Sequence, residues 1–75
     1  MNLQDRAFLR ALGHRIRERR IELKLTQANL GEKCGLHRTF IGSVERGERN
    51  VSILNLRQIA RALRVPVANL VAGVI

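Results

Sequence analysis

Aromatic residues are scarce in this chain of 75 residues, which has two phenylalanines, Phe8 and Phe40, and no tryptophan or tyrosine. A surface that binds single-stranded nucleic acid by stacking needs a row of aromatic faces, so this class of site is excluded. Cysteine occurs once, as Cys34, which excludes an internal disulfide and a cysteine-rich zinc module. We expect Cys34 to be a small buried hydrophobic residue.

Long apolar runs and acidic residues are also lacking. No run is long enough to span a bilayer, and charges interrupt residues 1–20, so we expect a reduced, cytoplasmic protein that does not enter a membrane. Lysine and arginine number 14 against 6 acidic residues, a formal charge of +8. This excess favours an acidic partner, nucleic acid first. His14 and His37 stand apart without a ligand cluster, so no metal or cofactor is expected.

Turn residues and apolar spacing divide the chain into five expected helices and no strand, within one domain covering residues 1–75. The helices are expected at 3–23, 27–34, 38–46, 53–63 and 67–71. Thr26 and Ser52 are suited to cap helix starts, and Gly35 and Gly47 to end helices. Pro66 is suited to begin the fifth helix. The sequence therefore predicts an all-α fold with short connections.

The first helix carries a basic face, which we expect to be mostly solvated. Its members are Arg6, Arg10, Arg17, Arg19 and Lys24. Gly13 lies inside this helix and costs roughly 1 kcal/mol relative to alanine, which weakens the prediction for the turns before it. Phe8 is expected in core or dimer packing.

Residues 26–46 have the layout of a helix-turn-helix, two short helices joined at Gly35. In this motif the second helix presents the side chains at its N-terminal end to the major groove of DNA. The Arg38 guanidinium has the geometry to bind guanine O6 and N7, and Thr39 offers a hydroxyl or methyl group to a base edge. Ser43, one turn further on, is expected on the same face.

Several short sequence stretches resemble the motifs of a known protein family. They are RIRERR at residues 15–20, LTQANL at 25–30, GL at 35–36, FI at 40–41, VERG at 44–47 and IARAL at 59–63. Over about residues 12–72 the chain resembles the lambda-repressor-like (Cro/C1-type) helix-turn-helix family, which implies a compact five-helix DNA-binding domain. Residues 36–41 and 45–52 are similar to the controller proteins of restriction-modification systems. Those proteins are small dimeric regulators that bind operator DNA and time expression of the endonuclease.

The resemblance implies roles for individual residues. The positions that read bases in this family hold Arg38, Thr39 and Ser43. The positions that bind phosphates hold Gln27, Arg46, Asn50 and Ser52. Arg20 and Glu45 match a pair that bridges the first and third helices. Gln27 is also expected to brace the recognition helix. His37 departs from the small N-cap residue that is usual, so the cap is weaker or the imidazole contacts DNA. The alternative for Arg20 and Glu45 is an exposed ion pair of little energetic value.

The expected function is sequence-specific transcriptional regulation by a homodimer bound to a pseudo-palindromic DNA operator, with RNA polymerase as a candidate further partner. The second half of the chain has more apolar residues than one short helix pair is expected to bury. We expect these residues to form the dimer interface: Leu56, Leu63, Val65, Leu70, Val71, Val74 and Ile75. An enzyme is not expected, because no nucleophile, base or metal set converges. The alternative is an antitoxin or other small repressor of this type that acts through a protein partner.

Overall fold

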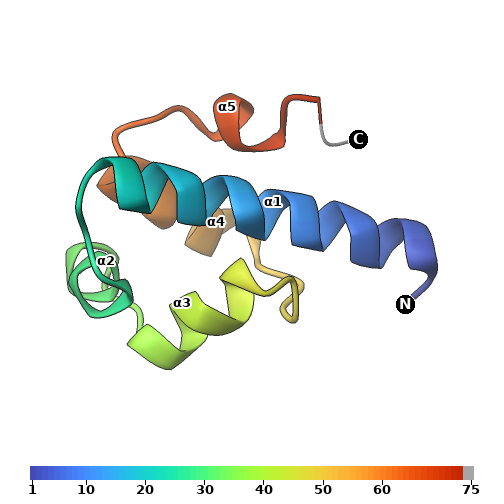
Figure 1. The fold of residues 1–75 in the computed structure, drawn as a ribbon, viewed down its shortest axis with the longest axis horizontal. Coiled ribbons are helices and arrows are strands. Elements are labelled where there is room, and N and C mark those ends of the chain that lie inside the picture. Colours follow the sequence, from blue (N-terminus) through green and yellow to red (C-terminus); the bar gives the residue numbers. More distant parts are fainter. Residues whose placement is uncertain (74–75) are drawn as a thin grey trace.

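The computed structural model describes residues 1–73, which form five helices and no strand (Figure 1). The helices are α1 (Leu3–Glu22), α2 (Gln27–Cys34), α3 (Arg38–Glu45), α4 (Ile53–Ala62) and α5 (Val67–Val71). The all-α prediction is confirmed, and the bounds differ from the expected ones by at most one residue. In α1, α3 and α4 the residue expected to end the helix is its C-cap: Leu23, Arg46 and Leu63. The predicted Val74 and Ile75 lie outside the described residues.

The helices surround the core as a ring. The main contacts run from α1 to α3, to α2, to α4, to α5 and back to α1, and α3 and α5 lie on opposite sides of α1 (Figure 1). With 20 residues, α1 is about 30 Å long, which matches the longest dimension of 31 Å. Its N-terminal end therefore reaches the edge of the molecule.

Hydrogen bonds at the start of α2 fix where the first helix of the helix-turn-helix begins. The Thr26 side chain accepts from the Asn29 backbone N–H at 2.9 Å, and the Asn29 side chain accepts from the Thr26 N–H at 3.1 Å. This reciprocal capping box satisfies two amide groups that the first turn of α2 cannot bond internally. Gly35 ends α2 at φ +73°, a left-handed conformation in which a side chain would be strained. The chain can then turn directly into α3.

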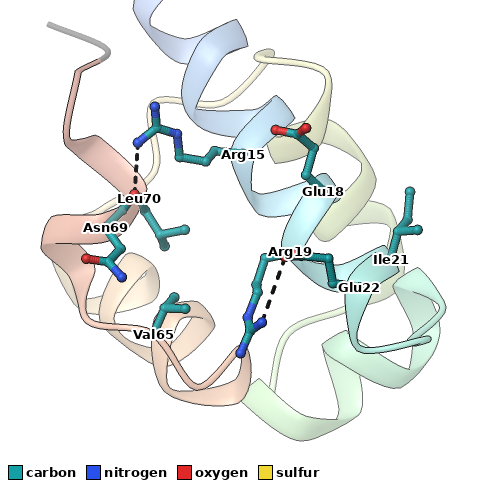
Figure 2. Close-up of a pocket in the computed structure, with 8 residues that line it drawn as sticks. All are labelled: Arg15, Glu18, Arg19, Ile21, Glu22, Val65, Asn69 and Leu70. Atoms are coloured by element: carbon teal, nitrogen blue, oxygen red, sulfur yellow. Dashed lines mark hydrogen bonds and ion pairs between the residues drawn. The ribbon is translucent and has the colours of Figure 1, made fainter.

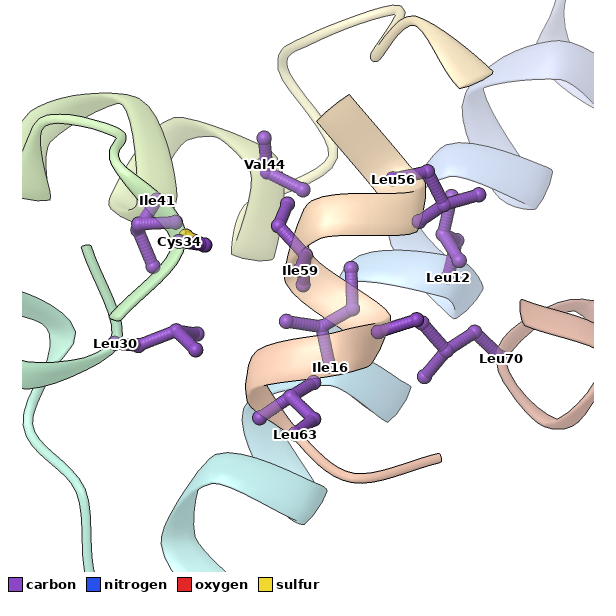
Figure 3. Close-up of a cluster of buried hydrophobic side chains, with 11 residues drawn as sticks. Leu12, Ile16, Leu30, Cys34, Ile41, Val44, Leu56, Ile59, Leu63 and Leu70 are labelled. Carbon is purple, nitrogen blue, oxygen red and sulfur yellow. The ribbon is translucent and has the colours of Figure 1, made fainter. Parts of the chain in front are cut away.

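One contiguous core contains residues from every helix (Figure 3). Its members are Leu12, Ile16, Leu30, Cys34, Ile41, Val44, Leu56, Ile59, Ala60, Leu63 and Leu70. Cys34 lies in this cluster as expected, and burial raises the pKa of its thiol. The interpretation of Leu56, Leu63 and Leu70 as a dimer interface is wrong, because the chain's own helices bury all three. The stripe on α4 is fully used inside one chain.

Two arginines of α1 fasten the C-terminal helices. Arg19 Nε donates to the Leu63 carbonyl at the end of α4 at 3.0 Å. Arg15 Nη1 donates to the Asn69 carbonyl at 2.9 Å (Figure 2). It also donates to the Ala72 carbonyl at the end of α5. Carbonyls at helix ends have no partner within the helix, and a cation also suits the helix dipole there. Arg19 is therefore an exception on the basic face, which the sequence predicts to be mostly solvated.

Gly13 does not interrupt α1, because its missing side chain is what allows α1 to meet α3. A Cβ atom at this position would lie 2.3 Å from the Val44 carbonyl oxygen and 2.6 Å from that of Glu45. Backbone oxygens cannot move aside as a flexible side chain can. The close contact thus fixes the end of α3 against α1.

We expect Gly13→Ala to lower the free energy of unfolding by about 1–3 kcal/mol, the usual cost of overpacking. The gain in helix propensity from glycine to alanine, roughly 1 kcal/mol, acts in the opposite direction and does not offset the clash. Urea unfolding followed by circular dichroism measures the change. The neighbouring exposed His14→Ala is the control and should unfold like the parent. A Gly13→Ala protein as stable as the parent would show that the contact relaxes at no cost.

Candidate nucleic-acid interface

The first turn of α3 presents its side chains outward. Arg38 and Thr39 are exposed, and the Arg38 guanidinium has no hydrogen-bond partner within residues 1–73. His37 is the N-cap: its Nδ1 accepts from the Thr39 backbone N–H at 3.1 Å and lies 2.8 Å from Thr39 Oγ1. The imidazole therefore replaces the small N-cap residue that is usual there. Arg38 therefore presents its positive charge to solvent from the first turn of a capped helix.

Ser43 is placed differently from expectation. Its side chain is buried, its hydroxyl donates to the Phe40 carbonyl at 2.7 Å, and it accepts from Arg49 Nε at 3.2 Å. The interpretation of Ser43 as a freely presented base-reading hydroxyl is wrong for this arrangement, since both interactions lie within the chain. Arg49 also stacks on the Phe40 ring, 5.3 Å from its centroid. This three-residue contact, which the sequence did not reveal, ties the α3–α4 loop to α3.

A buried network braces α3 from two sides. Arg20 binds Glu45 through two hydrogen bonds, Nε to Oε2 at 2.6 Å and Nη2 to Oε1 at 3.0 Å. The side chains are 11% and 3% exposed, so the geometry is not that of an exposed surface pair. The Glu45 carboxylate raises the pKa of Arg20 further above its already high ordinary value. Arg20 Nη1 also donates to the Leu25 carbonyl at 2.8 Å, just before α2 begins.

Gln27 completes this network from α2. Its Nε2 donates to Glu45 Oε1 at 3.1 Å, so one carboxylate joins α1, α2 and α3. Gly42 leaves room for this arrangement, because a Cβ there would lie 3.2 Å from Gln27 Oε1. The amide is half-buried and at the start of α2. It thus links the two helices of the motif, which is the bracing position that the resemblance implies.

The loop between α3 and α4 carries the other predicted phosphate-binding residues. Arg46 is exposed and its Nε lies 3.0 Å from Glu48 Oε2; this contact holds the pKa of the Glu48 carboxyl below its ordinary value. Asn50 is exposed. Ser52 caps α4, since its Oγ accepts from the Asn55 N–H at 3.1 Å. These residues follow the end of α3 on one continuous segment.

A groove of about 510 Å³ lies elsewhere, between α1 and α5 (Figure 2). Its lining includes Arg15, Arg19, Ile21, Val65 and Leu70, and none of the predicted base-reading residues. Of the predicted dimer residues, Val65 and Val71 are half-buried. Within residues 1–73 no group of three potential metal ligands comes together, and none of the helices there has an apolar stretch of the length that a membrane span requires. The α3 surface and this groove are separate faces.

Known proteins are similar over most of this chain. Residues 16–70 match the helix-turn-helix family. Control protein C.SmaI of Serratia marcescens is 48% identical over 59 residues, which cover 79% of this chain and 70% of the relative. The crystal structure of the restriction-modification controller protein C.AhdI from Aeromonas hydrophila has a TM-score of 0.81 at 42% identity, covering 83% and 94% of the two chains.

A DNA-bound structure is similar as well. The P22 c2 repressor in complex with a synthetic operator has a TM-score of 0.78 at 37% identity, and the match covers 83% of this chain and 94% of the repressor chain. The family match includes α2, α3, α4, the C-terminal part of α1 from residue 16 onward and most of α5. The chain therefore belongs to the Cro/C1-type helix-turn-helix family of DNA-binding transcriptional regulators.

Proposed function

We propose that the protein is a restriction-modification controller that binds a pseudo-palindromic operator as a homodimer. The observation that carries this proposal is the exposed start of α3, where Arg38 and Thr39 project from a helix held by the Arg20–Glu45–Gln27 network. A reading helix must keep its orientation when it enters the major groove, because misplaced donors lose their base partners. The likeness to two controller proteins supports the role.

In this proposal Arg38 and Thr39 read bases. His37 caps α3 and lies next to them, at the edge of the DNA major groove. Phosphates are bound by Gln27, Arg46, Asn50 and Ser52. Arg46 exchanges its exposed contact with Glu48 for a phosphate oxygen of the DNA backbone, and its binding to this polyanion is favoured by the release of counterions. The chain acts as a single cytoplasmic domain without catalytic activity, and RNA polymerase is a candidate partner at the promoter.

The α1–α5 face is the proposed dimer interface. Val65 and Ile21 line the groove there, and Ile21 is 52% exposed. Val71 of α5 is half-buried. Two chains bound to one operator should be related by a two-fold axis and place their α3 helices in successive major grooves, roughly 34 Å apart. An interface of this kind is isologous, so one substitution changes both sides of the contact.

Light scattering during a mobility-shift titration tests the proposal. We expect two chains per operator duplex, and Ile21→Glu or Val71→Glu should lower the affinity for the duplex by weakening the dimer. Exposed Gln58→Glu on α4 is the matched control and should leave the stoichiometry unchanged. A single chain of 8.5 kDa at micromolar concentration, with and without DNA, would contradict the homodimer.

The second candidate is an antitoxin or small repressor that uses the α1–α5 groove for another protein. The observation that favours it is the same apolar groove, which is large enough for a partner's side chains. Co-purification from the source cell distinguishes the two. A stable complex with a different chain, rather than two copies of this one, would favour the antitoxin.

A further inference from the structure

The N-terminal half of α1 lies outside the matched family region, which begins at residue 16. Within it, Arg6 and Arg10 are exposed, and neither side chain has a hydrogen bond or ion pair to the rest of residues 1–73. They are four residues apart and so occupy one face of the helix. Gly13, one turn further, places that face toward the end of α3.

This helix face packs directly on the α3–α4 loop. Gly47 has φ +75°, and a Cβ there would lie 2.7 Å from Arg10 Cγ and 2.8 Å from Arg10 Cα. One hollow is lined by Met1, Arg6, Arg10, Arg46, Gly47 and Glu48. A second hollow brings Asn50 next to Asp5, Phe8 and Leu9 of the same part of α1. The position of Arg10 relative to the loop is thus fixed by backbone contact.

The charges in the first hollow do not balance. Arg6, Arg10 and Arg46 face a single carboxylate, Glu48, which already binds Arg46. Two of the residues in these hollows, Arg46 and Asn50, are proposed phosphate contacts. A DNA backbone that follows the loop therefore meets the face of α1 that carries the two unpaired guanidinium groups. A duplex is the extended polyanion whose repeating charge fits such a line of arginines.

We propose that Arg6 and Arg10 bind DNA phosphates that flank the bases read by α3, so that the N-terminal half of α1 lengthens the operator footprint of each protomer. This inference depends on the proposed operator binding. It adds no sequence information by itself, since phosphate contacts fix the register and strength of binding. Its effect should therefore depend on the length of the duplex and the salt concentration.

The test compares Arg6→Gln/Arg10→Gln with the matched control Arg57→Gln/Arg61→Gln, which removes two exposed arginines at the same spacing from α4. Each protein is titrated with the selected operator in two lengths, one extending well beyond both half-sites and one trimmed at their outer edges. Melting curves verify that both variants remain folded. The salt series gives the slope of log affinity against log salt for each pair.

On the long duplex we expect the α1 variant to bind more weakly by roughly one to two orders of magnitude at ~0.1 M salt, with a slope shallower by about 0.9 for each phosphate that the variant no longer neutralises. On the trimmed duplex it should match the parent, and the α4 control should match the parent on both. An unchanged affinity and slope on the long duplex would overturn the inference. Equal losses of affinity on both duplexes would overturn it too, since the effect would then not be local to the flank.

Failure of the proposed function gives a different result. If the parent protein binds no duplex selectively, operator binding itself is wrong. If Arg38→Ala abolishes selective binding while the α1 variant behaves as the parent, operator binding stands and only the flanking contact is wrong. Loss of binding to anionic lipid vesicles by the α1 variant, without a change on DNA, would assign the two arginines to a membrane surface and overturn the inference.

Discussion

Arg20→Ala should lower the free energy of unfolding by about 3–5 kcal/mol, the range found when one partner of a buried ion pair is removed. The Glu45 carboxylate is 3% exposed and would keep only the Gln27 amide as a partner. It also lies at the C-terminal end of α3, where the helix dipole disfavours a negative charge. A domain of this size has a total stability of roughly 4–11 kcal/mol, so the variant should lose a large fraction of its stability and melt at a much lower temperature than the parent.

Two further variants separate the ion pair from general damage to the fold. Adding Glu45→Gln to Arg20→Ala should recover part of the stability, because the buried group is then neutral. Arg46→Ala removes a guanidinium from an exposed pair and should melt with the parent. A melting temperature for Arg20→Ala within a degree or two of the parent would show that the network contributes little.

Arg38→Ala should reduce discrimination between operator and scrambled DNA by about 1–3 kcal/mol per half-site, the value of one bidentate base contact. For two half-sites this becomes roughly 2–6 kcal/mol, at least tenfold in the affinity ratio. The physical reason is the planar fork of the guanidinium, which matches two acceptors on guanine. Its exposure and lack of an internal partner within the described residues mean that no interaction of the free protein has to be broken.

Arg38→Lys is the matched variant, since it keeps the charge and loses the fork. It should lose most of the discrimination while its salt slope stays close to that of the parent. An equal loss of affinity on operator and scrambled DNA, with a slope shallower by about one per site, is the behaviour of a phosphate contact. That result would transfer base reading to Thr39 or His37.

Local rules made the helices predictable from sequence. Capping residues such as Thr26 and Ser52 satisfy amide groups within three residues, and Gly35 supplies a left-handed backbone conformation at the adjoining helix end. These effects depend on neighbours in the chain, so no tertiary knowledge is needed. The same local pattern placed Arg38 and Thr39 at a helix start, where they are found exposed.

The features that the sequence did not reveal depend on contacts between residues that are far apart in the chain or brought together by a loop. Arg19 bonds a carbonyl 44 positions away, and Ser43 meets Arg49 only because the loop folds back on α3. The apolar stripe that includes Leu63 gives no sign of which surface covers it; here the covering surface is the core of the same chain rather than a partner. Gly13 shows the same limit, since a residue that weakens an isolated helix marks a close contact between two helices.

The most direct test of the account is selection of bound duplexes from a random DNA pool, followed by measurement of the mass of the selected complex. We predict an inverted repeat that is bound by two chains. The centres of its two half-sites should lie about 10 base pairs apart, or a whole-number multiple of that helical repeat. The same selection with Arg38→Ala should lose preference at one symmetric pair of positions. Recovery of no enriched sequence, or of a single half-site bound by one chain, would contradict regulation by a sequence-specific dimer.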